Sequence, residues 1–497
     1  MVGYNVASRG KQRAKFSGHP KSGVHTIVVL DNEHETPGMD FEVKERDVPF
    51  LKPFVPKAAE WLVRSTNGRV TRTLASAALL FVDMNDFVKT SMDTARHVPS
   101  TGCEMYSHRV TSRGPRRLLE TSSQCNSYMR EVLAEYFEKL IRIVLAYDGA
   151  VVALMGDALL AAWFVEVNQN ETDSHLTHVT QRARFCAQSI LSDVHGRALR
   201  GALIVKVKLM ISTGPVTFVP IRLVSHSYEV TVTGEALNDF QKMKRDMEAG
   251  KVVFNKLSSE LLSRTITPCP MSLSCALNST RDDVSSQIGT DSTHFVSVHV
   301  VQAFNHGLVY GLPSKNEVCT VVFVRFSAKS IEHDEWCDER FIHCVKAIET
   351  AVSACRGSLL QIVVDENGPS CMCAFGLLGA PKQHAASRGL RCAQKILRAL
   401  PDLKTRVTCG VATGSVNTGP VCSTRRSAFH LEVSLIGLPV ILAARLAEAT
   451  NSRSVAMDEE TRVHATSFTF DMTRSSWYAY GLKGFPRETR SFVVDYS

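Results

Sequence analysis

The stretch ALLFVDMNDF, residues 78–87, reads as a buried strand that ends on a carboxylate. Six apolar residues, 77–82, lead directly to Asp83. A buried carboxylate without a partner is costly, so a core strand seldom ends on an isolated acid. Asp83 is therefore either an ordinary strand-end acid that faces water or caps the next helix, or one of two acids that hold a cation.

The bulk composition predicts a globular protein. The chain has 497 residues, of which 44% are hydrophobic and 21% charged, which is enough for about two to four domains. The net charge of +8 favours anionic partners such as nucleotides, but it is too diffuse to predict nucleic-acid binding. No apolar run is long enough to span a membrane, and the 14 cysteines show no C-x-x-C pair. We expect reduced thiols and a cytoplasmic location.

Segments of the first half recur in the second half in the same order, displaced by roughly 240 residues in the first pair and roughly 200 thereafter. The pairs are ALLFVDMNDF (78–87) with CTVVFVRFSA (319–328), GDALLAAWF (156–164) with GPSCMCAFG (368–376), RARFCAQSIL (182–191) with RGLRCAQKIL (388–397), LMISTGPV (209–216) with CGVATGSV (409–416), and VTVTGEAL (230–237) with VSLIGLPV (433–440). Five matches in order predict two copies of one domain.

Each copy has the same expected order of elements. A strand leads to a long amphipathic helix, a hairpin, a helix with the shared C-A-Q-x-I-L, a strand ending at Thr-Gly, and a final strand, glycine and helix. This order predicts an α+β fold of two ferredoxin-like βαββαβ units in tandem, with the helices on one face of each sheet. We expect domains at 73–258 and 318–497, a linker at 259–317, and a partly disordered extension at 1–55.

A second acid, Asp157, lies in the expected hairpin turn MGDALLA (155–161). In a βαββαβ sheet the first strand lies beside the hairpin, so Asp83 and Asp157 can approach each other. Two neighbouring carboxylates repel unless a cation lies between them, and oxygen ligands suit Mg²⁺ or Mn²⁺ bound together with a phosphate. Alternatively, Asp157 is an ordinary Gly-Asp turn residue.

The second copy lacks both acids, because Arg325 and Pro369 stand at the corresponding positions. Two copies with one set of acids suggest a single working site at the interface between them.

These motifs resemble those of the class III nucleotide cyclases, and within them the soluble adenylyl cyclases with two cyclase domains in tandem. FVDMNDF is similar to the family's F-x-D-I-S-G-F strand end, and GDALLA to its second metal-aspartate motif. HSYEVTVTGEALND (226–239) and FHLEVSLIGLPVILAAR (429–445) resemble its two late strand-to-helix motifs. The resemblance implies cyclisation of ATP to 3′,5′-cyclic AMP and pyrophosphate on two Mg²⁺ or Mn²⁺ ions, in intracellular signalling, with the two domains paired about a pseudo-two-fold axis.

The resemblance also implies roles for individual residues. Asp83 and Asp157 match the two metal ligands, and Arg445 matches the arginine that stabilises the pentavalent phosphorus. Lys208, or its neighbour Lys206, can reach the triphosphate from its strand. From spacing alone, Arg445 fits a surface helix arginine equally well, and strand lysines are usually solvated.

Three positions differ from the family pattern on the nucleotide side. Gln361 stands at the adenine-selecting lysine and Ser434 at its polar partner, and both can still hydrogen-bond a purine. Ile441 replaces the asparagine that positions the ribose, and isoleucine cannot form that hydrogen bond.

In the pseudo-symmetric second pocket, Ala153 and Gln241 replace the lysine and arginine that hold bicarbonate in soluble cyclases. Bicarbonate sensing is therefore not expected.

Three functional hypotheses follow. The first is a soluble adenylyl cyclase, and the second is a weak or inactive nucleotide-binding pseudocyclase that regulates a partner. Guanylyl selectivity ranks below both, because Gln361 is neutral where a guanine reader is usually acidic.

Overall fold

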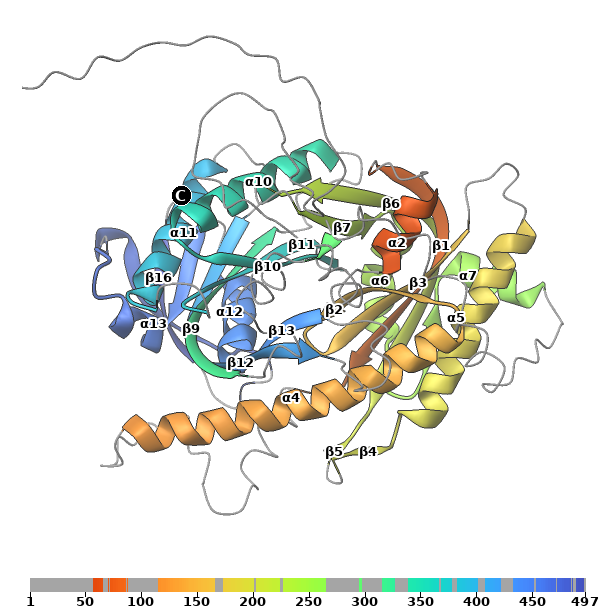
Figure 1. Ribbon diagram of the computed structural model, residues 1–497, viewed down its shortest axis with the longest axis horizontal. Coiled ribbons are helices and arrows are strands. Elements are labelled where there is room, and N and C mark those ends of the chain that lie inside the picture. The colour runs from red at the N-terminus through yellow and green to blue at the C-terminus, as the bar shows by residue number, and fades with distance from the viewer. Residues whose placement is uncertain are drawn as a thin grey trace, which may run out of the picture.

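The structure is a computed structural model with two α+β units, one in each half of the chain (Figure 1). The residues that it describes are 57–65, 70, 72–85, 87, 115–165, 173–200, 203–223, 227–264, 295–296, 315–326, 338–365, 368–377, 382–400, 407–421, 432–450, 453–470, 472–483, 485 and 489–495.

The first unit contains one large sheet with helices around it. Its elements are α2 (Lys57–Ser65), β1 (Thr73–Met84), α4 (Pro115–Ala146), β2 (Ala150–Met155), β3 (Ala158–Val165), α5 (Asp173–Asp193), β4 (Ala198–Leu199), β5 (Leu203–Ile204), β6 (Val207–Arg222), β7 (Tyr228–Thr233), α6 (Glu235–Met243), η3 (Lys244–Asp246), β8 (Val252–Phe254) and α7 (Lys256–Ser263).

The second unit repeats this order and extends it at the C-terminal end. Its elements are β9 (Lys315–Phe326), α10 (Asp338–Ala354), β10 (Ser358–Asp365), β11 (Gly368–Phe375), α11 (Ala385–Ala399), β12 (Val407–Val421), β13 (Glu432–Ile436), α12 (Leu438–Ala449), β14 (Ser454–Asp458), α13 (Glu459–His464), η6 (Met472–Arg474), β15 (Ser475–Tyr480) and β16 (Thr489–Asp495).

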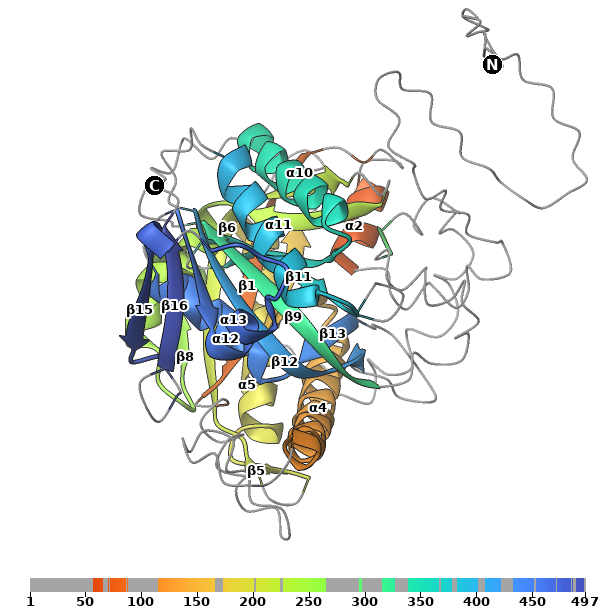
Figure 2. The ribbon, with the colours of Figure 1, turned by 90° about the vertical axis from the view of Figure 1, so that its left-hand side faces the viewer.

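The strand order confirms the expected ferredoxin-like arrangement. The first sheet runs β2-β3-β1-β6-β7, and the second contains the matching path β10-β11-β9-β12. In each unit the opening strand lies between the hairpin and a later strand, and both of its pairings are antiparallel. Two elements that the sequence analysis did not foresee, β8 and β14, pair parallel to β6 and β12. Strands β16 and β15 extend the second sheet to its margin (Figure 2).

The central position of β1 explains its continuous apolar sequence. A strand with neighbours on both sides and covered faces buries every residue, so apolar and polar residues do not alternate. Leu80 and Val82 pack with α4 and α5, whereas Leu79 and Phe81 face the core that includes α6. The sequence-based expectation of helices on one face is therefore wrong. Helices cover both faces, because β1 presents apolar side chains to each.

Two further expectations differ from the structure. The strands expected to end at Thr213-Gly214 and Thr413-Gly414 continue, since β6 extends to Arg222 and β12 to Val421. Helix α2, which precedes residue 73, packs on the first unit. Trp61 of α2 stacks on Phe218 and packs against Phe164, with ring centroids 4.7 Å apart in both pairs.

The expected domain limits stay predictions, although α7 continues past the proposed boundary at 258. Residues 1–55 and most of the expected linker lie outside the described residues.

The long β6 and β12 strands bring the two units into contact. Val219 and Ile221 of β6 belong to an apolar core of the second unit, and Ile436 belongs to a core of the first. Helix α4 packs against both units (Figure 1), and its buried Asn126 side chain donates a 2.8 Å hydrogen bond to the carbonyl oxygen of Ser415. Apolar and polar contacts therefore join the halves.

No helix among the described residues is long and apolar enough to cross a membrane.

A buried polar cluster with the same hydrogen-bond pattern lies in the core of each unit. In the first unit the Asn255 side-chain oxygen accepts hydrogen bonds from the backbone N–H groups of Thr213 and Ser258. In the second unit Asp458 Oδ1 accepts the same pair, from Thr413 and Thr461. The cluster is thus centred on the amide of Asn255 in the first unit and on the carboxyl group of Asp458 in the second. Burial is the main cause that raises the pKa of Asp458 to about 6.

We expect Asp458→Asn to remove a pH dependence of stability. An acid whose pKa is higher in the folded than in the unfolded state stabilises the fold below the unfolded pKa, and this stabilisation is lost as the pH rises through the folded value. The free energy of unfolding of wild type should fall by up to ~3 kcal/mol between about pH 4 and pH 6. Denaturant unfolding across this range measures the loss, which the variant should lack.

Asn255→Asp is the matched control, because it places a carboxyl group in the equivalent polar cluster. It should introduce the same decrease of the free energy of unfolding with rising pH. Equal slopes in wild type and Asp458→Asn would contradict this account.

Candidate active site

Asp83 lies at the end of β1 with partners on both sides. Across the antiparallel ladders it stands opposite Ala158 of β3 and Lys208 of β6. Directly opposed residues project from the same face of a sheet, with Cβ atoms about 5 Å apart. The Lys208 side chain therefore projects from the same face as Asp83, whereas Lys206 is exposed and precedes the strand.

Asp157 lies in the tight turn between β2 and β3, immediately before Ala158. The turn depends on Gly156, whose φ of +68° suits glycine. Because Ala158 is opposite Asp83, the register brings the two acids to the same end of the sheet. Burial, and next the charge of Asp83, raise the pKa of Asp157 to about 8. The two carboxylates repel each other, and a divalent cation would remove that cost.

Two cations of the second unit act on the same acid. The charges of Arg445, on α12, and Lys483, in the turn after β15, both lower the pKa of Asp157, which partly opposes the effect of burial. Acids from one half of the chain and cations from the other half therefore meet at one place. The sequence analysis missed Lys483, because it lies in a C-terminal segment that has no counterpart in the first repeat.

Arg445 forms an ion pair within its own helix. Its Nη1 atom is 2.8 Å from Oε2 of Glu448, one helical turn away. The other Glu448 oxygen lies 3.8 Å from Nη1 of Arg325. Glu448 thus links the arginine that acts on Asp157 to the arginine that replaces an acid in the second repeat.

The register of the second sheet places the replacements where the acids stand in the first. Arg325 is opposite Ser370 of β11 and Thr408 of β12, as Asp83 is opposite Ala158 and Lys208. Pro369 directly precedes Ser370, as Asp157 precedes Ala158. The second repeat therefore has Arg325 and Pro369 at the positions of the two carboxylates.

Gln361 and Ala153 occupy matching positions in the two hairpins. Each follows a register shift in its strand, between Leu359 and Gln361 in β10 and between Val151 and Ala153 in β2. The Gln361 amide nitrogen donates a hydrogen bond to the carbonyl oxygen of Leu154. The side chain therefore contacts the hairpin that carries Asp157.

Ile441 is a packing residue in this structure. It is partly buried and packs against the main core of the first unit, to which Ile436 of β13 also belongs. Ser434 is half-buried on the same strand, opposite Gly419 of β12. The position expected to hold a ribose thus makes an apolar contact between the halves.

Helix α12 can approach its sheet closely because β12 carries Gly410. A Cβ atom at this position would lie 1.9 Å from the carbonyl oxygen of Ala443. The corresponding residue of β6 is Met210, which packs in the core beside α6. Gly410 therefore sets the depth at which α12 carries Ile441 and Arg445.

The helix starts give a reference for one expected equivalence. Helix α6 begins after Gly234 and helix α12 after Gly437. Counting eight residues from each glycine places Lys242, rather than the exposed Gln241, at the position of Arg445. Counting four places Asn238 at the position of Ile441. The repeat of VTVTGEAL (230–237) in VSLIGLPV (433–440) already matches the two glycines, so the sequence itself contains this register.

No group of three or more His, Cys, Asp and Glu side chains suited to a metal occurs among the described residues. The site offers instead two acids whose mutual repulsion disfavours the doubly charged state. Two oxygen donors leave coordination positions for water and phosphate, which fits Mg²⁺ or Mn²⁺ bound together with a nucleotide.

We expect the acid pair to make metal-free stability pH-dependent. Because the folded pKa of Asp157 is raised, its contribution to stability is present at low pH and is lost as the pH rises through about 8. Asp83→Asn removes the repulsion, so at pH 9 the metal-free variant should melt at a higher temperature than wild type. Mn²⁺ should raise the melting temperature of wild type and not of the variant.

Glu260→Gln, at an exposed acid on α7, is the control and should behave like wild type. The N-cap of this helix, Asn255, contacts Thr213, which pairs with Ala78, five residues before Asp83 on β1. Equal Mn²⁺ stabilisation of wild type and Asp83→Asn would show that the pair binds no metal.

No protein-family model matches the chain. Adenylate cyclase type 10 of Rattus norvegicus is 22% identical over 410 residues, which cover 73% of this chain and 24% of the relative. The Homo sapiens protein of the same name is 20% identical over 361 residues, 64% of this chain and 21% of the relative. The chain spans about a quarter of the length of these relatives.

Among solved structures, a class III adenylyl cyclase-like ATP-binding protein from Pseudomonas aeruginosa matches with a TM-score of 0.50 and 10% identity. The match covers 79% of this chain and 85% of that protein, so it spans both units. The chain therefore has the fold of class III nucleotide cyclases, and its sequence is similar to that of adenylate cyclases type 10.

Proposed function

We propose that the chain converts ATP to 3′,5′-cyclic AMP and pyrophosphate at the cleft where its two units meet. One observation carries this proposal: Asp157 of the first unit, paired with Asp83, lies within the electrostatic reach of Arg445 and Lys483 of the second. Anionic and cationic groups on opposite sides of one cleft suit a metal-bound triphosphate.

The acids of the first unit would hold the cations. Asp83 and Asp157 would ligate two Mg²⁺ or Mn²⁺ ions together with the phosphates, and ions at this position lower the charge of the triphosphate and the leaving pyrophosphate. Lys208 lies on the same face as Asp83 and would bind the outer phosphates.

The second unit would supply positive charge to balance the negative charge that develops on the phosphoryl oxygens. When the ribose 3′-oxygen attacks the α-phosphorus, negative charge accumulates on the phosphoryl oxygens until the bond to pyrophosphate breaks. The Arg445 guanidinium suits this charge because it donates several parallel hydrogen bonds. To reach the phosphate, Arg445 would exchange its contact with Glu448 for one with the substrate. Lys483 would add a second positive charge.

The purine would lie near Gln361 and Ser434 of the second unit. The amide oxygen and nitrogen of Gln361 can pair with either a donor or an acceptor edge, although the nitrogen already donates to Leu154. We therefore propose preference for ATP with incomplete rejection of GTP.

A second function, a weakly active or inactive nucleotide-binding pseudocyclase with a regulatory role, is favoured by Ile441. Its side chain packs against the first unit and offers the ribose no hydrogen bond. The matching solved structure is itself described as a cyclase-like ATP-binding protein. Under this proposal the acids and Arg445 bind the metal-nucleotide, and the cleft transmits that binding to a partner.

We expect Ile441→Asn to raise the rate of cyclic nucleotide formation at least ~10-fold, about 1.4 kcal/mol of barrier, because it restores an orienting hydrogen bond. The same change removes an apolar contact between the units, so it should cost about 1–3 kcal/mol of stability. Steady-state kinetics with ATP and GTP in Mn²⁺ measure the first effect and denaturant unfolding measures the second.

Ile441→Val is the matched control, because it reduces the apolar contact without adding an amide and should not increase the rate. If wild type binds Mn²⁺–ATP and neither it nor Ile441→Asn forms cyclic nucleotide, the pseudocyclase proposal replaces the enzyme. If wild type is fast and Ile441→Asn slows it, another residue orients the ribose.

We expect Gln361→Lys to shift the preference towards ATP, because an ammonium group can donate to an adenine ring nitrogen and repels the donor edge of guanine. The ratio of kcat/KM values for ATP and GTP measures the shift. An unchanged ratio would place the purine elsewhere.

A further inference from the structure

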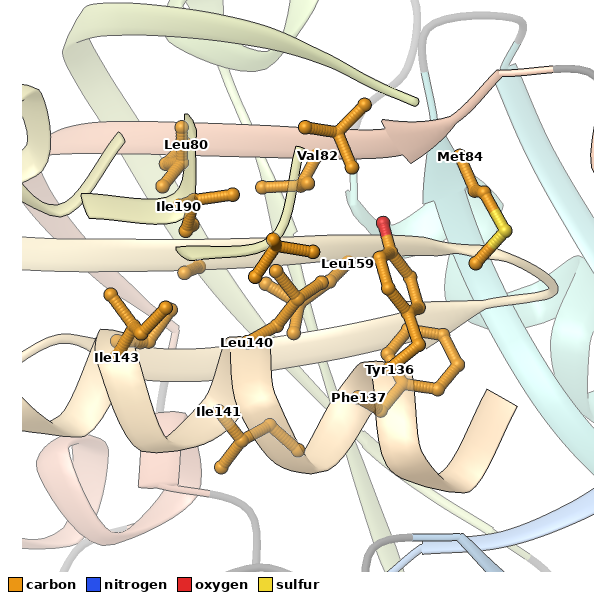
Figure 3. Close-up of a cluster of buried hydrophobic side chains, with 14 of the residues drawn as sticks. Leu80, Val82, Met84, Tyr136, Phe137, Leu140, Ile141, Ile143, Leu159 and Ile190 are labelled. Carbon is orange, nitrogen blue, oxygen red and sulfur yellow. The ribbon is translucent and has the colours of Figure 1, made fainter. Parts of the chain in front are cut away.

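One buried hydroxyl in the core of the first unit has no partner of its own. Tyr136 lies on α4 with 0% exposure, and its hydroxyl makes no hydrogen bond to any residue that the structure describes. Figure 3 shows this hydroxyl pointing from α4 to the end of β1 that carries Val82 and Met84.

The hydroxyl adds nothing to the apolar packing around it. The ring of Tyr136 packs against the ring of Phe137, 5.2 Å away, in a cluster built from apolar side chains. A buried hydroxyl without a partner costs about 1–3 kcal/mol of folding free energy. A phenylalanine would keep the packing and avoid this cost, so the hydroxyl calls for a ligand or partner outside the apolar cluster.

The charges of both acids act on Tyr136. After burial, the charges of Asp157 and then Asp83 are the causes that raise the pKa of Tyr136 well above its usual value. A phenol is neutral at physiological pH in any case and can donate a hydrogen bond. Leu159 projects from β3 to the α4 face, and Asp157, two residues earlier, has the same parity along the strand. Asp157 is thus the nearer candidate acceptor.

We propose that Tyr136 is a positioning residue of the acid pair, whose hydroxyl donates a hydrogen bond to the Asp157 carboxylate when that carboxylate binds a divalent cation. The proposal deepens the proposed function and rests on its metal site. A carboxylate ligand has more lone pairs than one metal bond uses, and a donor on its other side fixes its orientation. Burial of the hydroxyl without a partner lowers the free energy of unfolding. The hydrogen bond formed on metal binding would offset that loss.

The test is Mn²⁺ binding to the full chain, measured by titration calorimetry without nucleotide. We expect Tyr136→Phe to weaken the affinity about 10-fold, the lower limit of what a group behind a ligand usually contributes. Its metal-free melting temperature should equal or exceed that of wild type, because the unpartnered hydroxyl is gone. A residue that serves packing alone would show no change in affinity.

Phe137→Leu is the matched control, because it disturbs the same core without touching the hydroxyl. It should lower the melting temperature and leave Mn²⁺ affinity unchanged. As a second measurement on wild type, the tyrosine ultraviolet difference spectrum on Mn²⁺ addition should show a new hydrogen bond, and Asp157→Asn should abolish it. This spectrum keeps the test decisive if Tyr136→Phe does not fold.

Two results would overturn the proposal. Unchanged Mn²⁺ affinity in Tyr136→Phe, with an unchanged tyrosine spectrum in wild type, would leave the metal site intact and remove only the role of Tyr136. Absence of any Asp157-dependent Mn²⁺ binding in wild type would instead reject the metal site, and with it both this proposal and the proposed function.

Discussion

Two carboxylates forced together at the end of a sheet are the constraint on which the site depends. The β2–β3 hairpin places Asp157 beside Ala158, and the β1–β3 ladder places Ala158 opposite Asp83. Strand pairing fixes the backbone at both positions, and burial together with the charge of Asp83 raises the pKa of Asp157. A site that holds two like charges in place is prepared for an ion of the opposite charge. The neighbouring phenol of Tyr136 and the cations of the second unit are arranged around this point.

The two repeats have the same framework and different chemistry. Both units have the buried polar cluster that links the long strand to its parallel neighbour, through Asn255 in one unit and Asp458 in the other. Both keep the bulged hairpin and the helix that follows an N-cap glycine. At the strand ends the first repeat presents acids and the second presents Arg325 and Pro369. Each unit needs its own buried polar cluster in order to fold. A site shared by the two units needs each chemical group in only one of them.

The contact between the units also places the residues of the proposed site. Ile436 and Ile441 pack into the first unit, and the long ends of β6 pack into the second, so apolar burial holds the halves together. Gly410 lets α12 lie close to β12, which brings Arg445 towards the acids. The same apolar contact takes up the position where a hydrogen bond to a ribose is expected. Stability of the interface and chemistry at the interface thus compete for one residue.

The sequence by itself determined the architecture of each unit. Apolar periodicity, turn residues and the internal repeat predicted the long helix before Gly149, the Gly156-Asp157 hairpin and the order of strands, because these features depend on local patterns. The pairing of Asp83 with Asp157 was also predictable, since it follows from strand neighbours in a βαββαβ sheet.

Only the tertiary structure decided how the units meet. Lys483 joins the site from a C-terminal segment without a repeat, the Gln361 amide contacts the opposite hairpin, and the Tyr136 hydroxyl is buried within an apolar helix face without a hydrogen-bond partner among the described residues. No local pattern encodes these contacts, because each depends on the distance between elements that are remote in the chain.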